Sequence, residues 1–169
     1  QSRRHSGWVR GRGRRPPARL ADKRRGRVAR VTAKQRVVSV GGGTAGITVA
    51  ARLQRKGHDD VAVIEPSDTH YYQPLWTLVG GGQAKASTTA RPEASVMPKG
   101  ARWIQNAATA VDPDNNTVSC ADGAKYEYDV LVVCPGIQLD WSRTDGFQES
   151  LGKDGVSSNY RFDLAPPTG

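Results

Sequence analysis

Three glycines near the start of the patterned part of the chain have the spacing of a dinucleotide-binding turn. Gly41, Gly43 and Gly46 follow the G-x-G-x-x-G pattern directly after the apolar stretch 37–40. Gly41 allows a sharp turn off a strand, Gly43 lets a pyrophosphate approach the backbone, and Gly46 allows close packing of a helix on the sheet. The N–H groups at the start of that helix would then face the phosphates.

One acidic residue strengthens this interpretation. Glu65 ends a second apolar stretch, 61–64, and lies 19 residues after Gly46. This is close to the ~20 residues expected for the acid that accepts hydrogen bonds from ribose hydroxyls. A carboxylate here favours a free 2′-hydroxyl and disfavours the 2′-phosphate of NADP. At this point FAD and NAD both remain open.

A βαβ unit is expected to position these residues. Strands at 37–40 and 61–64 flank a stretch, 45–56, whose apolar residues recur at helical spacing, and Gly57 ends that helix. The glycine motif therefore has a strand before it, a helix after it, and an acid at the end of the second strand. This context predicts a dinucleotide-binding domain.

Regular patterning returns after residue 100. Asp122 and Gly123 separate two short strand patterns, 117–120 and 125–128, which predicts an antiparallel hairpin. The apolar run 128–133 that follows predicts a parallel strand buried on both faces. The predicted fold class is therefore α/β, a Rossmann-like domain with a parallel sheet and an inserted antiparallel β-hairpin.

Charge divides the chain into parts. Residues 1–36 hold 12 Arg and 2 Lys against the single acid Asp22, whereas residues 37–169 are mildly acidic, which argues against nucleic-acid binding by the patterned part. We expect a disordered Arg-rich leader or tail at 1–36, a Rossmann-like domain at 37–140, and the loop-like start of a truncated segment at 141–169. For the leader, a transit peptide, a basic tail that binds RNA or an anionic membrane, and a disordered extension remain open.

The two cysteines, Cys120 and Cys134, match no disulfide framework and no metal motif. Each is expected to pack in a strand as a small hydrophobe rather than to act as a thiolate nucleophile. No residue is assigned as catalytic or as a metal ligand. The first residue, Gln1, and the end of the chain at Gly169 predict a processed or incomplete protein.

With these residues in view, the chain from about Val37 to Tyr160 resembles the mitochondrial sulfide:quinone oxidoreductases. The general features are the glycine loop, Glu65, and the apolar strand that ends in Gly136. The pair Cys134-Pro135 departs from the residues that usually precede this last glycine. The more specific stretches are 65–67 (EPS), 70–80 (HYYQPLWTLVG), 91–92 (RP), 94–96 (ASV), 136–140 (GIQLD) and 158–160 (SNY).

The resemblance implies an FAD-binding Rossmann-like domain, with FAD rather than NAD in the glycine loop. Contact with the pyrophosphate is implied for Gly41, Gly43, Thr44, Ala45 and Gly46. Glu65 would bind the adenosine ribose, and Gln73 would lie in the flavin-side loop. The backbone of Ala108 would bracket the adenine, and Gly136 would pack the turn near the cofactor.

In that family, sulfide attacks a disulfide between two redox cysteines, and electrons pass through the flavin to ubiquinone. The resemblance places these cysteines, the quinone pocket, a second dinucleotide-binding domain and membrane-attaching helices beyond Gly169. It implies an FAD-dependent oxidoreductase of the mitochondrial inner membrane that is inactive as the present chain alone, with sulfide and ubiquinone as partners and no nucleic acid. Two alternatives remain: another FAD or NAD oxidoreductase, such as a type II NADH dehydrogenase, and a cofactor-free fragment whose basic tail binds nucleic acid.

Overall fold

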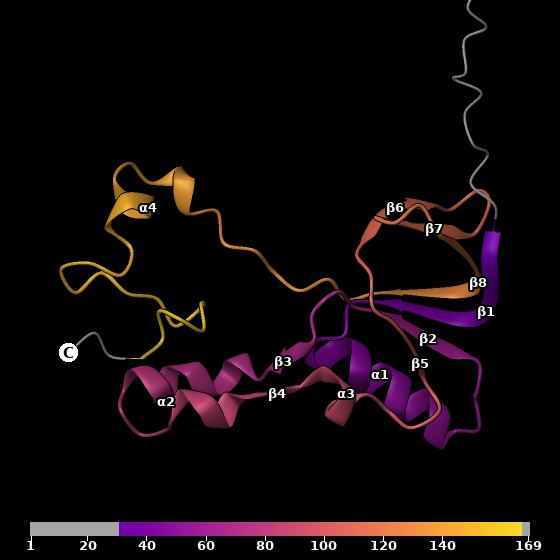
Figure 1. Cartoon of the computed structure of the whole chain (residues 1–169), viewed down its shortest axis with the longest axis horizontal. Coiled ribbons are helices and arrows are strands. Elements are labelled where there is room, and N and C mark those ends of the chain that lie inside the picture. The colour runs from indigo at the N-terminus through magenta and orange to yellow at the C-terminus, as the bar shows by residue number, and fades with distance from the viewer. Residues whose placement is uncertain (1–30, 167–169) are drawn as a thin grey trace, which may run out of the picture.

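The computed structural model describes residues 31–166, which form a curved mixed β-sheet with the helix α1 (Thr44–Arg55) on one face (Figure 1). The six strands lie in the order β5-β2-β1-β8-β7-β6, with β5, β2, β1 and β8 parallel and the other two antiparallel. Their bounds are β1 Val31–Val40, β2 Val61–Ile64, β5 Arg102–Ile104, β6 Ala108–Asp112, β7 Thr117–Cys120 and β8 Lys125–Val133. The predicted α/β fold class with an inserted hairpin is confirmed.

The first strand begins earlier than the sequence predicts. Residues 31–36, expected to belong to a disordered leader, are the first part of β1 and pair in parallel with the start of β8. Lys34 Nζ lies 2.8 Å from Asp129 Oδ1. Most side chains of this part of β1 are exposed, so ladder pairing rather than apolar burial holds it. The rest of the proposed leader, residues 1–30, lies outside the described residues.

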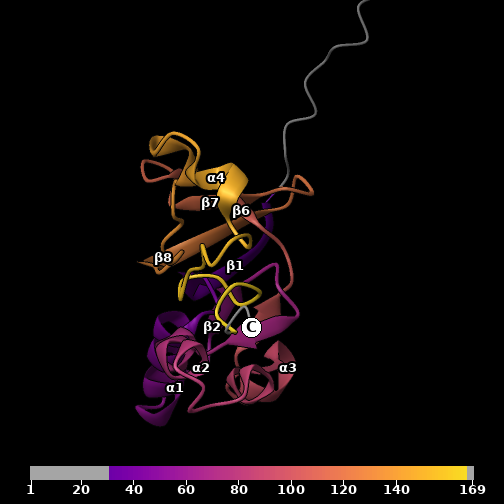
Figure 2. The ribbon, with the colours of Figure 1, turned by 90° about the vertical axis from the view of Figure 1, so that its left-hand side faces the viewer.

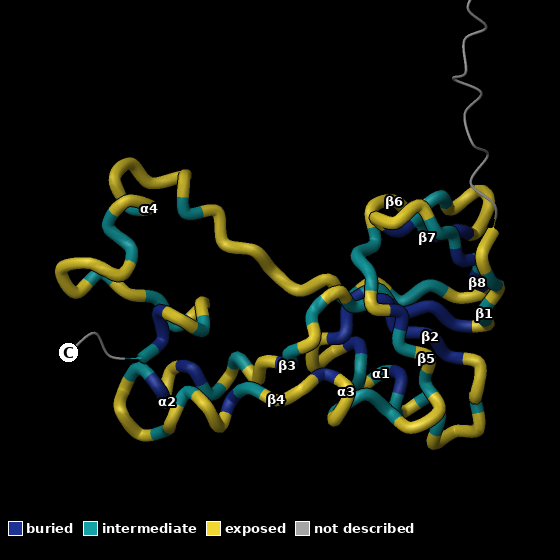
Figure 3. The backbone as a smooth tube through the Cα atoms, viewed as in Figure 1, coloured by how far each residue is buried: buried dark blue, intermediate teal, exposed yellow. Residues whose placement is uncertain are grey.

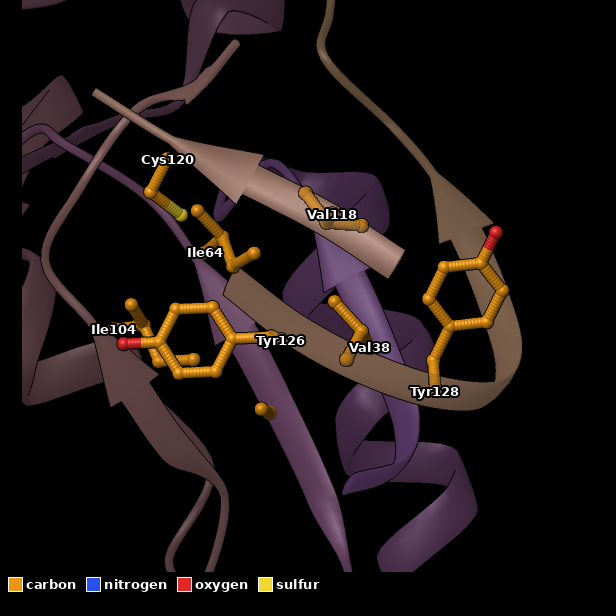
Figure 4. Close-up of a cluster of buried hydrophobic side chains, with 8 residues drawn as sticks. Val38, Ile64, Ile104, Val118, Cys120, Tyr126 and Tyr128 are labelled. Carbon is orange, nitrogen blue, oxygen red and sulfur yellow. The ribbon is translucent and has the colours of Figure 1, made fainter. Parts of the chain in front are cut away.

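Two apolar layers cover the two faces of the sheet. Successive side chains of a strand point to opposite faces, so Val37 and Val38 enter different layers. One layer lies under α1 and contains Val37, Ala50, Val61 and Val63. The other lies under the β7–β8 hairpin, which curls over the sheet, and contains Val38, Ala62, Ile64, Ile104, Val118, Cys120, Tyr126 and Tyr128 (Figure 4). The core therefore holds the carboxyl ends of β1 and β2 in fixed positions.

A single strand, β8, fills the roles of the two predicted strands at 125–128 and 128–133. It is antiparallel to β7 over its first residues and parallel to β1 along its whole length. The prediction that its apolar part is buried on both faces is wrong. Val130 is 53% exposed on the face that carries α1, because α1 packs mainly over β1 and β2. Val133 points to the opposite face and is 61% exposed at the end of the strand, outside the apolar cluster of that face.

An arm leaves the sheet between β2 and β5. Strands β3 (Thr69–Tyr71) and β4 (Ala90–Pro92) pair antiparallel and carry α2 (Trp76–Gly80) away from the sheet (Figures 1 and 2). The short helix α3 (Glu93–Val96) follows β4 and leads back toward β5. The glycine loop thus lies at the base of the arm.

The C-terminal segment runs from the end of β8 through α4 (Phe147–Ser150) and returns to α2. Most of it is exposed (Figure 3) and irregular, as the sequence predicts. Near its end, Ala165 is buried against Trp76 and Val79 of α2. The arm and the C-terminal segment therefore meet at their far ends.

Candidate functional site

Two of the motif glycines are required by the fold itself. Gly41 has a φ of 100°, and a Cβ there would lie 2.0 Å from the carbonyl oxygen of Cys134. A Cβ on Gly46 would lie 1.9 Å from the carbonyl oxygen of Gly41, so a side chain there would push α1 off the sheet. Both observations fit the predicted roles of these glycines in the turn and in close helix packing.

Gly43 differs, because a Cβ there would meet no atom within 4 Å. Gly43, Thr44 and Ala45 are exposed at the start of α1. This helix has no side-chain cap and no acidic residue in its first turn. The first N–H groups and the positive end of the helix dipole thus face accessible space, which favours an anion such as a pyrophosphate.

Glu65 lies beside this loop at the end of β2, where its carboxylate is held by two backbone groups. Oε2 accepts a hydrogen bond from the N–H of Gly42 at 2.7 Å, and Oε1 accepts one from the N–H of Ser67 at 2.8 Å. A carboxylate offers about four lone-pair positions, so each oxygen can accept a further hydrogen bond. The half-buried Glu65 is therefore fixed in place and still able to bind ribose hydroxyls.

A cavity of about 750 Å³ lies on the other side of the loop. It brings together three of the predicted site residues, Thr44 from the start of α1, Gln73 from the arm, and Gly136 from the turn after β8. Its volume lies within the range of about 300–1,000 Å³ that is usual for pockets that bind organic ligands. No single stretch of the sequence forms this cavity.

Aromatic side chains form one wall of the cavity. The ring of Tyr71 lies 4.8 Å from that of Phe162 and 6.0 Å from that of Trp76, centre to centre. The buried Trp76 donates its Nε1–H to Oγ1 of Thr89 at 3.1 Å. This cluster joins the arm to the C-terminal segment and offers an apolar surface to a planar ring.

Charges in the cavity lining are paired. Arg161 donates hydrogen bonds to the carboxylate of Asp163 and lowers the pKa of that carboxyl. The lining thus presents an ion pair rather than an isolated charge to a ligand.

Ala108 does not line the cavity. It begins β6, where its half-buried side chain packs against the core cluster beneath the hairpin. The segment that leads to it from β5 lies beside Glu65, whose N–H donates to the carbonyl oxygen of Ile104 at 3.0 Å. Its role at the adenine stays a prediction.

Sequence reasoning missed three residues of the site. A Cβ on Gly42 would lie 2.6 Å from Cβ and Cγ of Glu65, so this position also requires glycine. His70 and Glu93 are buried next to the loop. The run of three glycines at 41–43 was a usable signal for Gly42, whereas no local pattern marks a buried charge in the polar stretch that contains Glu93.

The two cysteines occupy different surroundings. Cys120 is buried in the core, and this burial, with a smaller contribution from the charge of Asp122, raises the pKa of its thiol. Its predicted role as a small hydrophobe is confirmed. Cys134 is half-buried at the end of β8, and its N–H donates to the carbonyl oxygen of Val40 at 2.8 Å.

Within residues 31–166, no cluster of three or more His, Cys, Asp or Glu side chains could hold a metal ion. In the same range, no helix has the length and apolar character needed to cross a membrane.

Residues 35–164 match the family described as pyridine nucleotide-disulphide oxidoreductase. The chain belongs to this family. Its members typically bind FAD, which agrees with the glycine loop and the acid at the end of β2. The match covers all the strands of the sheet apart from the start of β1.

Two curated relatives show where in the family the chain lies. It is 44% identical over 135 residues to a mitochondrial sulfide:quinone oxidoreductase of Dictyostelium discoideum, with 79% of this chain and 30% of that protein covered. It is 41% identical over 125 residues to the enzyme of that name from Mus musculus, with 73% and 28% covered. The predicted resemblance to these enzymes is confirmed, although the chain spans only about 30% of their length.

Among solved structures, the sulfide:quinone oxidoreductase of Aquifex aeolicus has the same fold over this region. The TM-score is 0.66 at 28% sequence identity, and the match covers 78% of this chain and 30% of the other. The fold of this chain therefore corresponds to about 30% of the chain of that enzyme.

Proposed function

We propose that this chain binds FAD, with the pyrophosphate on the glycine loop, the adenosine at Glu65 and the flavin in the cavity. One observation carries this proposal. Thr44 belongs both to the exposed start of α1 and to the lining of the cavity. A molecule whose pyrophosphate lies on the loop therefore reaches Glu65 on one side and an aromatic-walled pocket on the other.

Each part of the site has a defined task in this proposal. The N–H groups of Gly43, Thr44 and Ala45 bind the pyrophosphate, while Gly41 and Gly46 keep the turn tight enough for α1 to point at it. Bound FAD supplies a reversible acceptor for two electrons.

The remaining predicted residues lie around the two ring systems. Gln73 and Gly136 border the flavin, and Tyr71 and Phe162 cover one side of it and exclude water. The backbone near Ala108 borders the adenine. Glu65 accepts hydrogen bonds from the ribose hydroxyls. Its negative charge repels a 2′-phosphate and so makes the binding of NADP unfavourable.

The finer proposal is that the chain is the FAD-binding part of a sulfide:quinone oxidoreductase of the mitochondrial inner membrane. Its support is the sequence identity to mitochondrial enzymes of that name. In the complete reaction, sulfide would be oxidised by two electrons to sulfane sulfur and ubiquinone would be reduced to ubiquinol with two protons, and the residues of this chain would hold the FAD that couples the two. The two cysteines of the chain are both free, and Cys120 is buried in the core, so they do not form the redox pair, which we place in another part of such a protein.

Calorimetric titration of the purified chain with FAD tests the binding proposal. We expect a one-to-one complex that keeps its flavin through gel filtration, and much weaker binding of NADP⁺, which carries a 2′-phosphate. A chain that binds no FAD under these conditions would refute the proposal.

The reaction is tested on a longer protein that contains this chain. Sulfide should bleach the flavin absorbance, and a ubiquinone analogue should restore it. Bleaching by NADH but not by sulfide would instead identify an enzyme of the type II NADH dehydrogenase class.

A further inference from the structure

Two buried ionisable side chains lie beside the glycine loop and have no part in the proposed contacts to FAD. His70 of β3 is 8% exposed, and Glu93, the first residue of α3, is 1% exposed. Nδ1 of His70 lies 3.3 Å from Oε2 of Glu93. Within the described part of the chain, neither His70 Nδ1 nor Glu93 Oε1 has a hydrogen-bond partner. Buried polar atoms of this kind are uncommon and require a physical explanation.

The Oε1 atom of Glu93 lies next to the glycine loop. A Cβ on Gly42 would lie 2.8 Å from this oxygen and 2.6 Å from Cβ and Cγ of Glu65. The N–H of Gly42 donates to Glu65 Oε2 at 2.7 Å. Gly42 is therefore packed against both acidic side chains, and Glu93 supports it from the buried side.

Backbone contacts connect Glu93 to the turn that holds Glu65. The N–H of Glu93 donates to the carbonyl oxygen of Asp68 at 2.7 Å. Ser67, the residue before Asp68, donates its N–H to Oε1 of Glu65 at 2.8 Å. The hydroxyl of Ser67 donates to the carbonyl oxygen of Thr69, also at 2.8 Å. A shift of Glu93 would therefore disturb both of the backbone groups that orient Glu65.

The electrostatics of the pair also involve Glu65. Burial raises the pKa of Glu93, the negative charge of Glu65 adds to this rise, and His70 opposes it. Two carboxylates this close repel one another unless one is neutral or has a positive partner. The geometry places His70 on the other side of Glu93, where its Nδ1 lies 3.3 Å from Oε2.

We infer that Glu93, held by His70, is a positioning residue that fixes the Gly42 peptide and the Glu65 carboxylate in the orientation that receives the adenosine ribose hydroxyls. This inference rests on the proposed binding of FAD. A purely structural role for the pair has a different consequence, because loss of local stability weakens the binding of all adenine nucleotides equally. Loss of positioning reduces specifically the preference for ligands with ribose hydroxyls.

The test compares ADP with 2′,3′-dideoxyadenosine 5′-diphosphate, which lacks both ribose hydroxyls, as competitors of FAD on the full chain. Hydrogen bonds to a charged group correspond to a preference of about tenfold or more for ADP in the wild type. The Glu93→Ala variant should lose most of this preference, whereas Glu93→Gln, which keeps the shape of the side chain, should retain it. The exposed Glu149→Ala on α4 is the matched control and should behave as wild type.

An unchanged preference in a folded Glu93→Ala variant overturns the inference. Thermal unfolding without ligand shows whether that variant folds. If it does not, His70→Leu provides the same test, and a reduced preference supports the inference while an unchanged one overturns it. Failure of the wild type to bind FAD, or a Glu65→Ala variant with the wild-type preference, instead refutes the proposed function.

Discussion

Replacement of Gly43 by valine separates binding of the pyrophosphate from stability of the fold. Gly43 has a φ of −63°, which valine adopts without strain, and a Cβ there would meet no atom within 4 Å. Without FAD, the free energy of unfolding of the Gly43→Val variant should therefore lie within about 1 kcal/mol of the wild-type value. With FAD, the branched side chain occupies the space that the pyrophosphate needs. Overpacking of about 1–3 kcal/mol corresponds to a loss of affinity of about 5- to 150-fold.

Two further variants make this experiment decisive. Gly46→Ala places a Cβ 1.9 Å from the carbonyl oxygen of Gly41, so it should destabilise the chain by about 1–3 kcal/mol even without FAD. Thr48→Val, a substitution of similar shape at an exposed position of α1, should change neither property. Urea unfolding without ligand and calorimetry with FAD measure the two quantities. Wild-type FAD affinity in Gly43→Val would show that the pyrophosphate does not lie at the start of α1.

Three other substitutions or treatments test neighbouring parts of the molecule. Glu65→Ala should weaken FAD binding by about 1–3 kcal/mol in calorimetry, and an unchanged affinity would remove Glu65 from the site. Iodoacetamide at neutral pH should leave Cys120 unmodified in the native chain and alkylate it after denaturation, as mass spectrometry would show; rapid native alkylation would contradict its burial. Because burial, with the charge of Glu65, raises the pKa of Glu93 above its ordinary 4.5, the folded state holds this proton more tightly than the unfolded state does. The stability of the wild type relative to Glu93→Gln should therefore fall as the pH rises from about 4.5 through the raised pKa, and parallel pH profiles of urea unfolding would contradict this.

The glycine loop could be predicted from the sequence because its determinants are local. A strand, three spaced glycines, a helix and an acid at the end of the next strand follow one another within 37–65. Strand β2 was predicted with its observed bounds, since four apolar residues in a parallel sheet are buried on both faces. The open space at Gly43 agrees with the role that the motif predicts for it, since a Cβ there would meet no atom within 4 Å, whereas a Cβ on Gly41 or Gly46 would overlap a backbone carbonyl oxygen.

Features that depend on distant pairing were not predictable in the same way. The early start of β1 has no apolar pattern, because it is held by its ladder to β8 and by the ion pair between Lys34 and Asp129. The sequence did not predict that 125–133 forms one continuous strand, because this strand pairs antiparallel with β7 and parallel with β1. The burial of Glu93 follows from the position of α3 beside the loop, which no charge pattern in 66–100 reveals.

The two ends of the proposed FAD site differ in how firmly the fold holds them. At the adenosine end, Glu65 directly follows the fully buried strand β2, and two backbone N–H groups fix its carboxylate. At the flavin end, the cavity lies between an arm and a largely exposed segment, and the buried contact between them is the cluster of Trp76, Val79 and Ala165. Because fixed groups lose little freedom on binding, affinity should come mainly from the ADP half of the cofactor. Binding of the flavin half depends on the arm and the C-terminal segment, which are held in place by their contact with each other and by the ligand. On the proposed function, the glycine loop, Glu65 and the Glu93–His70 pair are thus the part of the site that the fold already holds in place before FAD binds.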